Sequence, residues 1–237
     1  MSYFVILKLS MKNNIVVFAA HPDDEALGCS GSLALHSLNK DNIFVVFMTD
    51  GVSSRHSNNN KRNVNKRKIN CLSSLKTLNI KEQNIYFLNF PDNQLDTVPL
   101  LKIVKEVEKI INKCNPCIVY THFKNDLNID HKITYEAVMT ACRPLPNSTI
   151  EKILLFEVLS STDWSLNNNS PFQPNFFVDI TKSFQKKINA IKKYENEIKK
   201  KPHSRSLNNV KNLAIYRGSS VGVNYAEAFM VERIIKK

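Results

Sequence analysis

Hydrophobic residues occur along the first two thirds of the chain as short continuous runs separated by stretches with helical spacing. The runs of strand length cover residues 15–20, 43–48, 84–88, 117–120 and 153–159. The helical spacing covers residues 25–39, 61–78, 99–113 and 131–142. Continuous apolar strands that alternate with helices are typical of a parallel sheet covered on both faces. The pattern therefore predicts an α/β fold with a Rossmann-like, mostly parallel sheet and helices on both faces.

The pattern changes after about residue 160. It predicts a loop over 167–170, a short extended piece over 176–180 and a basic amphipathic helix over 181–200 with its lysines on the wet side. A helix over 207–217 and a strand over 228–235 follow. No linker or low-complexity block separates these elements from the rest, so we expect a single domain over 1–237. Its core spans about 11–160, and a C-terminal helical and strand extension spans about 161–237.

The first ten residues, MSYFVILKLS, are apolar but lack a basic start and a small-residue cleavage site. They match a signal peptide poorly and are expected to be an upstream start or an extra edge segment. No window approaches the roughly 18 consecutive apolar residues of a membrane-spanning helix.

The chain carries 33 basic and 21 acidic residues and a formal net charge of +12. Such a charge suits nucleic acid, anionic lipid or an acidic small molecule as partner. Lysine and asparagine are spread over the whole chain without a nucleic-acid-binding signature, so we expect no nucleic-acid partner. Contact between the basic helix and an anionic membrane surface stays open, as does the number of subunits.

Five cysteines are present, an odd number, and only CNPC at 114–117 has the spacing of a CxxC pair. This argues against a disulfide scaffold or a four-cysteine zinc site. Reduced thiols and a cytoplasmic location are expected instead.

The first predicted strand leads directly into HPDDE at 21–25. Ligands of open α/β sheets bind beyond the carboxyl ends of the strands, where this segment lies. His21 and Asp24 are three positions apart across a turn, so their side chains can converge while Asp23 points elsewhere nearby. A ligand pair with a free carboxylate beside it is what a metal-activated water requires. The competing interpretation is a helix N-cap formed by Asp23 or Asp24, with His21 idle.

A third ligand is expected from another strand end. The strand over 117–120 is followed by DLNIDH at 126–131, which ends in His131. Two imidazoles and one carboxylate, from His21, Asp24 and His131, leave a position open for water, as in catalytic zinc sites. Asp130 could hold the other ring nitrogen of a ligand histidine.

Three segments resemble the PIG-L/LmbE-like de-N-acetylases: AHPDDEALGCSGSLA (20–34), MTDGVSSR (48–55) and DLNIDH (126–131). Later segments are similar to a bacterial subgroup linked to surface polysaccharides: FEVLSSTDW (156–164), PNFFVDI (174–180), KPHSRS (201–206) and RGSSVGVNYAEAF (217–229). HPDDE with the downstream DH is a specific signal, whereas the later segments say less about the substrate. The resemblance implies a Rossmann-like fold and removal of an N-acetyl group from an amino sugar or a sugar-containing precursor.

The resemblance also implies roles for individual residues. His21, Asp24 and His131 match the ligands of one Zn²⁺ per chain, with another divalent metal such as Fe²⁺ as the alternative. Asp23 matches the general base, and Arg55 matches an arginine that grips substrate hydroxyls. The expected products are acetate and a free amine.

One position departs from the family pattern, because many relatives have a histidine where this chain has Asn128. In those relatives the histidine is thought to stabilise the oxyanion or protonate the leaving group. The candidates that remain for this catalytic task are Asn128, His122, His203 and Asp23 alone. For His122 the other interpretation is a strand-end histidine bonded to the backbone. His203 and Tyr225 are expected to bind substrate together with Arg55, and Glu227 in the segment 217–229 could also reach the sugar.

Four alternatives remain open. Two histidines and one carboxylate also bind Fe(II) in oxygenases, although those sites commonly sit on all-β scaffolds. The substrate could be a non-sugar amide metabolite, or the chain could be a catalytically impaired sugar-binding relative. A nucleotide-binding Rossmann domain is disfavoured, since the two aspartates of HPDDEALG would repel a pyrophosphate. The basic run KRNVNKRK (61–68) is interpreted as a solvated helix face, with phosphate binding as the other option.

Overall fold

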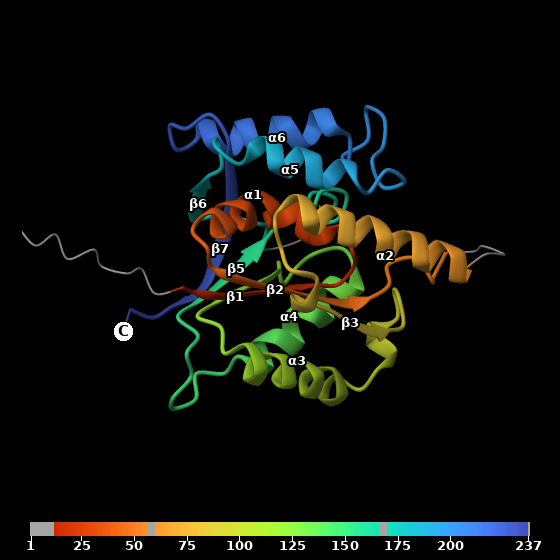
Figure 1. Cartoon of the computed structure of the whole chain (residues 1–237), viewed down its shortest axis with the longest axis vertical. Coiled ribbons are helices and arrows are strands. Elements are labelled where there is room, and N and C mark those ends of the chain that lie inside the picture. The colour runs from red at the N-terminus through yellow and green to blue at the C-terminus, as the bar shows by residue number, and fades with distance from the viewer. Residues whose placement is uncertain (1–11, 56–59, 166–169, 237) are drawn as a thin grey trace, which may run out of the picture.

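The computed structural model describes residues 12–55, 60–165 and 170–236. Over these ranges a seven-stranded sheet crosses the middle of the molecule and helices cover both of its faces (Figure 1). The predicted α/β class is confirmed. The segment 1–10 and most of the loop expected at 167–170 lie outside the described residues.

The strand order in the sheet is β3-β2-β1-β4-β5-β7-β6. The five strands from β1 to β5 run parallel, while β7 runs antiparallel to both β5 and β6. The strands are β1 (Asn14–Ala19), β2 (Asn42–Thr49), β3 (Ile85–Phe90), β4 (Ile118–His122), β5 (Lys152–Phe156), β6 (Phe176–Asp179) and β7 (Ala226–Ile234).

The helices form layers on the two faces. In Figure 1, α3 and α4 lie below the sheet, α1 and α2 lie above it, and α5 and α6 lie outside α1. The helices are α1 (Asp24–Leu38), α2 (Asn60–Thr77), α3 (Leu100–Cys114), α4 (Ile129–Ala141), α5 (Phe184–Lys192) and α6 (Leu207–Ser219), with short 3₁₀ helices at Glu82–Asn84 and Leu95–Thr97.

Both faces of the central strands are buried, which explains their continuous apolar sequences. In β1, Ile15 and Val17 pack into the core on one face, while Val16 and Phe18 pack into the core on the other. Alternate residues of a strand point to opposite faces, so a strand covered on both sides needs apolar residues at every position.

The position of β1 fixes where a ligand can bind. The chain leaves β1 to form β2 on one side and later forms β4 on the other side of β1. At such a reversal of strand order the connecting segments diverge and leave a crevice beyond the carboxyl ends. The segments after β1 and β4 therefore face each other.

The helix predicted over 181–200 is wrong in its extent, because α5 ends at Lys192. The turns that follow direct two side chains inward: Tyr194 Oη donates to Glu25 Oε1 at 2.6 Å, and Glu197 lies at 2.7 Å from Arg67 Nη1. These long-range contacts replace the continuation of the helix.

Two residues of the C-terminal extension have roles other than those expected. Lys187, expected on the wet side of its helix, is buried, and its Nζ donates to Glu227 Oε1 at 2.6 Å and to the Leu27 carbonyl at 2.7 Å. Glu227, expected near the sugar, is also buried and accepts the backbone N–H groups of Gly31 and Ser32. The ion pair between Lys187 and Glu227 joins α1, α5 and β7. Both carboxylate oxygens of Glu227 accept hydrogen bonds within this contact.

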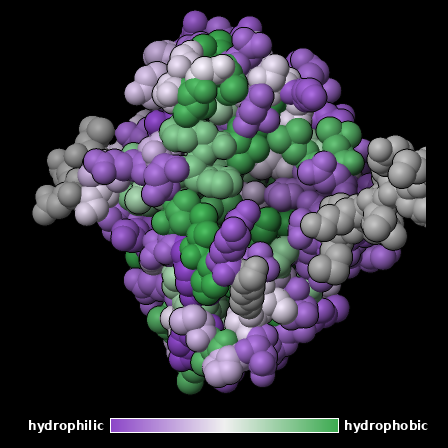
Figure 2. Space-filling model, turned by 90° about the vertical axis from the view of Figure 1, so that its left-hand side faces the viewer, coloured by the Kyte–Doolittle hydropathy of each residue, from purple (hydrophilic) through white to green (hydrophobic). Residues whose placement is uncertain are grey.

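Polar residues cover most of the face that Figure 2 shows. Figure 2 looks onto the side where β6 forms the edge of the sheet, and apolar residues gather there in a band between polar margins. Within the described part of the chain, no helix combines the length and the apolar character needed to cross a bilayer.

Candidate metal centre and active site

The turn between β1 and α1 places the first candidate residues. Asp23, at the N-cap position of α1, has a φ of 126°, a region that favours glycine, and its side chain makes no capping hydrogen bond. The capping interpretation is therefore wrong for Asp23. Asp24 begins the helix, and its Oδ2 accepts the backbone N–H of His21 at 2.8 Å. Backbone strain of this kind is typical of functional sites.

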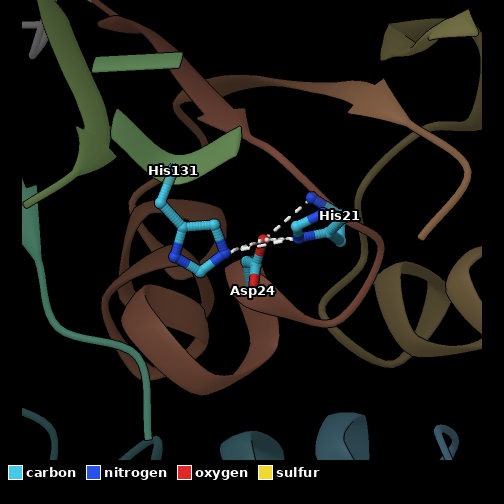
Figure 3. Close-up of side chains that lie close together, drawn as sticks. All are labelled: His21, Asp24 and His131. Carbon is cyan, nitrogen blue, oxygen red and sulfur yellow. Dashed lines mark hydrogen bonds and ion pairs between the residues drawn. The ribbon is translucent and has the colours of Figure 1, made fainter. Parts of the chain in front are cut away.

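Three side chains from two loops converge on one point (Figure 3). His21 Nδ1 lies 3.2 Å from Asp24 Oδ2, and His131 Nε2, from the first turn of α4, lies 3.3 Å from the same oxygen. The two ring nitrogens are 3.3 Å apart. All three residues are buried. The structure thus brings together the ligand set expected from the sequence.

A carboxylate lies behind each histidine. His21 Nε2 is 3.1 Å from Asp130 Oδ2, and His131 Nδ1 is 3.2 Å from Asp126 Oδ1. A carboxylate holds a proton on the ring nitrogen that faces it, which leaves the lone pair of the other nitrogen pointing inward. Asp130 lies where such a partner was expected. Asp126 was not assigned this role, although it belongs to the same DLNIDH segment.

The geometry fits a divalent cation. Zinc bonds of about 2.0–2.2 Å in a tetrahedron place neighbouring ligand atoms about 3.3–3.6 Å apart, close to the three separations found here. Two nitrogen lone pairs and a carboxylate oxygen that face each other would repel unless a positive charge lay between them. In addition, Asp24 Oδ1 is buried and has no hydrogen-bond partner among the described residues.

The electrostatics of the cluster favour positive charge. Burial alone would lower the pKa of both histidines, but contacts with Asp130 and Asp24 raise the pKa of His21 to about 10. The carboxylates of Asp24 and Asp126 raise the pKa of His131 to about 9. Burial opposes ionisation of Asp24, yet His131 and His21 hold its pKa well below the usual range. The same carboxylates that favour protonation of the two histidines would also stabilise a metal cation between them.

His122 lies behind the cluster. Its Nε2 accepts the backbone N–H of Ala20 at 2.8 Å, and its ring stacks on His131 with centroids 3.9 Å apart. The residue is fully buried, which holds its pKa well below the usual value and keeps the ring neutral. These contacts support the backbone-bonded interpretation of His122.

Asn128 is the N-cap of α4. Its Oδ1 accepts the backbone N–H of Asp130 at 2.8 Å, and its Nδ2 donates to Asn93 Oδ1 at 3.1 Å. Asn128 thus stabilises the helix turn that carries Asp130 and His131.

Asp23 lies between two arginines that the sequence analysis did not select. Its Oδ2 is 3.0 Å from Arg67 Nη2 and 2.8 Å from Arg205 Nη1. Burial raises the pKa of Asp23, although both arginines oppose this effect. Arg67 was expected on a solvated helix face, but its side chain is only 5% exposed. Arg205 belongs to the KPHSRS segment, and nothing local marks either arginine as a partner of Asp23.

The three residues expected to bind substrate lie in different places. Both terminal nitrogens of the half-exposed Arg55 contact Glu197 at 3.0 Å. His203 accepts the backbone N–H of Arg205 through Nδ1 at 3.0 Å, which places it in the loop that reaches Asp23. Tyr225 stacks flat on Phe184, with centroids 3.9 Å apart, and is not part of the cluster.

A further acidic residue, Asp92, lies beside the centre. Its Oδ1 is 3.4 Å from His21 Nε2, and its Oδ2 accepts the backbone N–H and the hydroxyl of Ser54. Asp92 follows β3 in the segment PDN, and its place at a strand end is the signal that could have identified it. Asp92 and Asp130 both lie near His21 Nε2, the ring nitrogen that points away from Asp24.

Comparison with known proteins gives one family. Residues 16–142, which contain all three candidate ligands and Asp23, match the PIG-L family model, described as GlcNAc-PI de-N-acetylase.

One relative in sequence and two in structure are informative. The chain is 29% identical over 191 residues to the "Uncharacterized deacetylase YaiS" of Escherichia coli (strain K12), covering 78% of this chain and 92% of that protein. The N,N'-diacetylchitobiose deacetylase of Pyrococcus horikoshii superposes with a TM-score of 0.75 at 22% identity, over 92% of this chain and 83% of that chain. GalB, the 4-carboxy-2-hydroxymuconate hydratase of Pseudomonas putida KT2440, superposes with a TM-score of 0.70 at 19% identity. The match covers 96% of this chain and 99% of that chain. The last two likenesses establish the fold alone.

Proposed function

The chain belongs to the PIG-L family of GlcNAc-PI de-N-acetylases, and on this premise we propose that it is a metal-dependent hydrolase that removes the acetyl group from the nitrogen of an amino sugar. Water and the amide are converted to acetate and a free amine. The observation that carries the proposal is the triangle of His21 Nδ1, Asp24 Oδ2 and His131 Nε2, with sides of 3.2–3.3 Å.

The proposed cofactor is one Zn²⁺ per chain, held by His21, Asp24 and His131. When bound, it supplies polarisation of the amide carbonyl and lowers the pKa of its water to about 7. Asp130 and Asp126 keep the two histidines in the tautomer that such binding needs.

Asp23 is the proposed general base. Its carboxylate takes a proton from the attacking water and returns one to the amide nitrogen, which must be protonated before it leaves as an amine. Arg67 and Arg205 hold Oδ2, so the orientation of the carboxylate is fixed before substrate arrives. A buried carboxyl group with a raised pKa suits both halves of this task.

The proposed substrate class is an N-acetylated sugar. Support comes from the family, and from a structural neighbour that is a deacetylase of N,N'-diacetylchitobiose. Arg55 is proposed to hold sugar hydroxyls, and its contacts with Glu197 restrict the guanidinium to one orientation. All five cysteines are free thiols, which supports a reducing compartment such as the cytoplasm as the proposed location.

Acetate release tests the proposal directly. The zinc-loaded protein is incubated with N-acetylglucosamine, N,N'-diacetylchitobiose and an N-acetylated amino acid as the non-sugar amide. We expect acetate from the sugars, its loss on chelation and its return when zinc is added. Acetate from the amino acid derivative alone would instead indicate a non-sugar deacylase, and oxygen consumption would indicate an oxygenase.

Two variants separate the roles of the neighbouring aspartates. Asp24→Ala is expected to purify without metal, because it removes a ligand. Asp23→Asn is expected to retain metal while kcat falls at least about 100-fold, the usual scale for loss of a general base. Elemental analysis and acetate release give the two readouts, and Asp96→Asn, at an exposed position, is the matched control. Loss of metal from Asp23→Asn would contradict this division of roles.

A further inference from the structure

The chain contains a single tryptophan, Trp164, and its surface is 48% exposed. It lies in the turns that follow β5, in a segment whose first residues were expected to continue the strand to residue 159. Ligand sites commonly use a large aromatic ring that is held in place while one face remains open. The position of Trp164 relative to the metal centre therefore matters.

The turn that carries Trp164 is fixed to one side of the metal centre. Thr162 Oγ1 donates to Asp126 Oδ2 at 2.6 Å, and Ser161 Oγ donates to the other oxygen of the same carboxylate. Ser161 Oγ is also 3.5 Å from His131 Nδ1. Three residues of chain span at most about 11 Å, so the backbone of Trp164 lies within that distance of Ser161.

A second loop brings an imidazole to the same ring. His203 and Trp164 have ring centroids 5.3 Å apart at an interplanar angle of 59°. The hydroxyl of Ser204 donates to Asp163, which ties the two loops together. The next residue of this loop, Arg205, binds Asp23 at 2.8 Å. The two rings thus belong to loops that reach a ligand histidine on one side and the candidate base on the other.

We propose that Trp164 and His203 form a subsite for a second sugar ring, next to the amino sugar whose acetyl group is removed. This rests on the proposed function and narrows its substrate to an amino sugar in glycosidic linkage with another pyranose. A pyranose has an apolar C–H face that packs on an aromatic ring and polar hydroxyl edges. Asp163, next to Trp164 in the chain, is exposed, and its carboxylate can accept hydrogen bonds from such hydroxyls. An alkyl chain would instead need a continuous apolar surface.

Fluorescence measures occupancy of this subsite directly, because all tryptophan emission comes from Trp164. The zinc-loaded protein is mixed rapidly with N,N'-diacetylchitobiose, and emission is recorded before turnover. We expect a saturable change in emission with the disaccharide and a change less than half as large with N-acetylglucosamine. Equal responses to the two sugars, or no saturable response to the disaccharide, would overturn the proposal.

Steady-state kinetics of variants supply the second readout. Trp164→Ala is expected to raise KM for the disaccharide about 10-fold, the effect of losing one well-placed aromatic contact. KM for the monosaccharide and kcat for both sugars are expected to change less than about 2-fold, since uniform binding alone is lost. Trp164→Phe is expected to restore most of the affinity, and His203→Ala to raise the same KM by a smaller factor.

The matched control is Tyr216→Ala, which removes an exposed aromatic residue of α6 and is expected to leave KM unchanged. Thermal unfolding of each variant checks that it folds. Equal rises of KM for both sugars would show that Trp164 only packs the loop, and this would overturn the proposal. The same applies if octyl N-acetylglucosaminide depends more strongly on Trp164 than the disaccharide does.

Failure of this inference differs from failure of the proposed function. If Trp164→Ala leaves acetate release from both sugars unchanged, the subsite is contradicted and the proposed deacetylase activity still stands. If the emission changes only with the disaccharide and no sugar releases acetate, the deacetylase activity is contradicted and the disaccharide-binding site still stands.

Discussion

At the scale of single residues, the candidate ligand His131 depends on a neighbouring carboxylate. That carboxylate belongs to Asp126, which faces His131 Nδ1 and also accepts the hydroxyls of Ser161 and Thr162. Those hydrogen bonds and the histidine hold the pKa of Asp126 well below its usual range, against the effect of burial. The residue stays ionised and keeps a proton on the outer nitrogen of the ring.

Asp126→Asn tests this role. The amide keeps the size of the side chain but loses the charge that orients the His131 tautomer, so metal affinity is expected to fall by about 10–100-fold. Competition with a chromogenic chelator measures the affinity. Asp179→Asn, an exposed substitution at the end of β6, is the control. Unchanged affinity would mean that Asp126 only joins two loops.

The residues that could be predicted are those marked by a local pattern. HPDDE and the downstream DH identified the three candidate ligands, because each lies directly after a buried strand or opens the following helix. The arginines around Asp23 carry no such mark. Arg205 is 182 positions away from Asp23, and only the folded chain brings them together. Asp92 and Asp126 differ from these arginines, because each follows the carboxyl end of a parallel strand and so carries a signal that could have identified it.

At the scale of elements, α1 must pack closely on the sheet for Asp24 to reach the site. A Cβ atom at Gly28 would lie 2.4 Å from Phe156 Cδ2 and 2.7 Å from Cγ of the same ring, which belongs to β5. Real atoms do not approach so closely, and Phe156 is itself fully buried. Glycine at this position therefore sets the distance between α1 and β5.

Gly28→Ala is expected to destabilise the protein by about 1–3 kcal/mol, because overlap in a packed core outweighs the better helix propensity of alanine. Urea unfolding measures the change. Metal affinity is expected to fall as well, since a shift of α1 moves Asp24. Ser37→Ala, at the half-buried end of the same helix, is the control. Stability equal to that of the wild type would show that Phe156 has room to move.

Sequence periodicity predicted the central strands well and the C-terminal elements less well. β1, β2 and β4 are buried on both faces, so their sequences are apolar throughout and easily recognised. The predicted helix over 181–200 was too long, since residues 194 and 197 satisfy contacts with α1 and α2 rather than helical geometry. The antiparallel pairing of β7 also depends on partners far away in the sequence.

At the scale of the whole molecule, Glu197 joins the C-terminal extension to the core. Its carboxylate contacts Arg55 at 3.0 Å and Arg67 of α2 at 2.7 Å. Burial would raise the pKa of Glu197, but these arginines lower it to about 2. Because the pKa is lower in the folded than in the unfolded chain, the carboxylate stabilises the fold above about pH 4.5. This contribution is lost as the pH falls toward 2.

Glu197→Gln is expected to lower the free energy of unfolding at pH 6 by at most about 3 kcal/mol, the value that the shift in pKa implies before solvent screening. Between pH 4.5 and 3 the wild type is expected to lose stability more steeply than the variant. Urea unfolding across this range measures both, and the exposed Glu195→Gln is the control. Parallel pH profiles for wild type and Glu197→Gln would contradict the assignment.

The distance in sequence between the two candidate ligand histidines has a consequence for folding. His21 and His131 are 110 positions apart, on the two sides of the strand-order reversal. An ion bound to both would cross-link almost half of the polypeptide into a loop, and unfolding would then have to open that loop or release the ion. During synthesis such an ion would bind both histidines only after residue 131 has left the ribosome, and it would then join the turn after β1 to the first turn of α4.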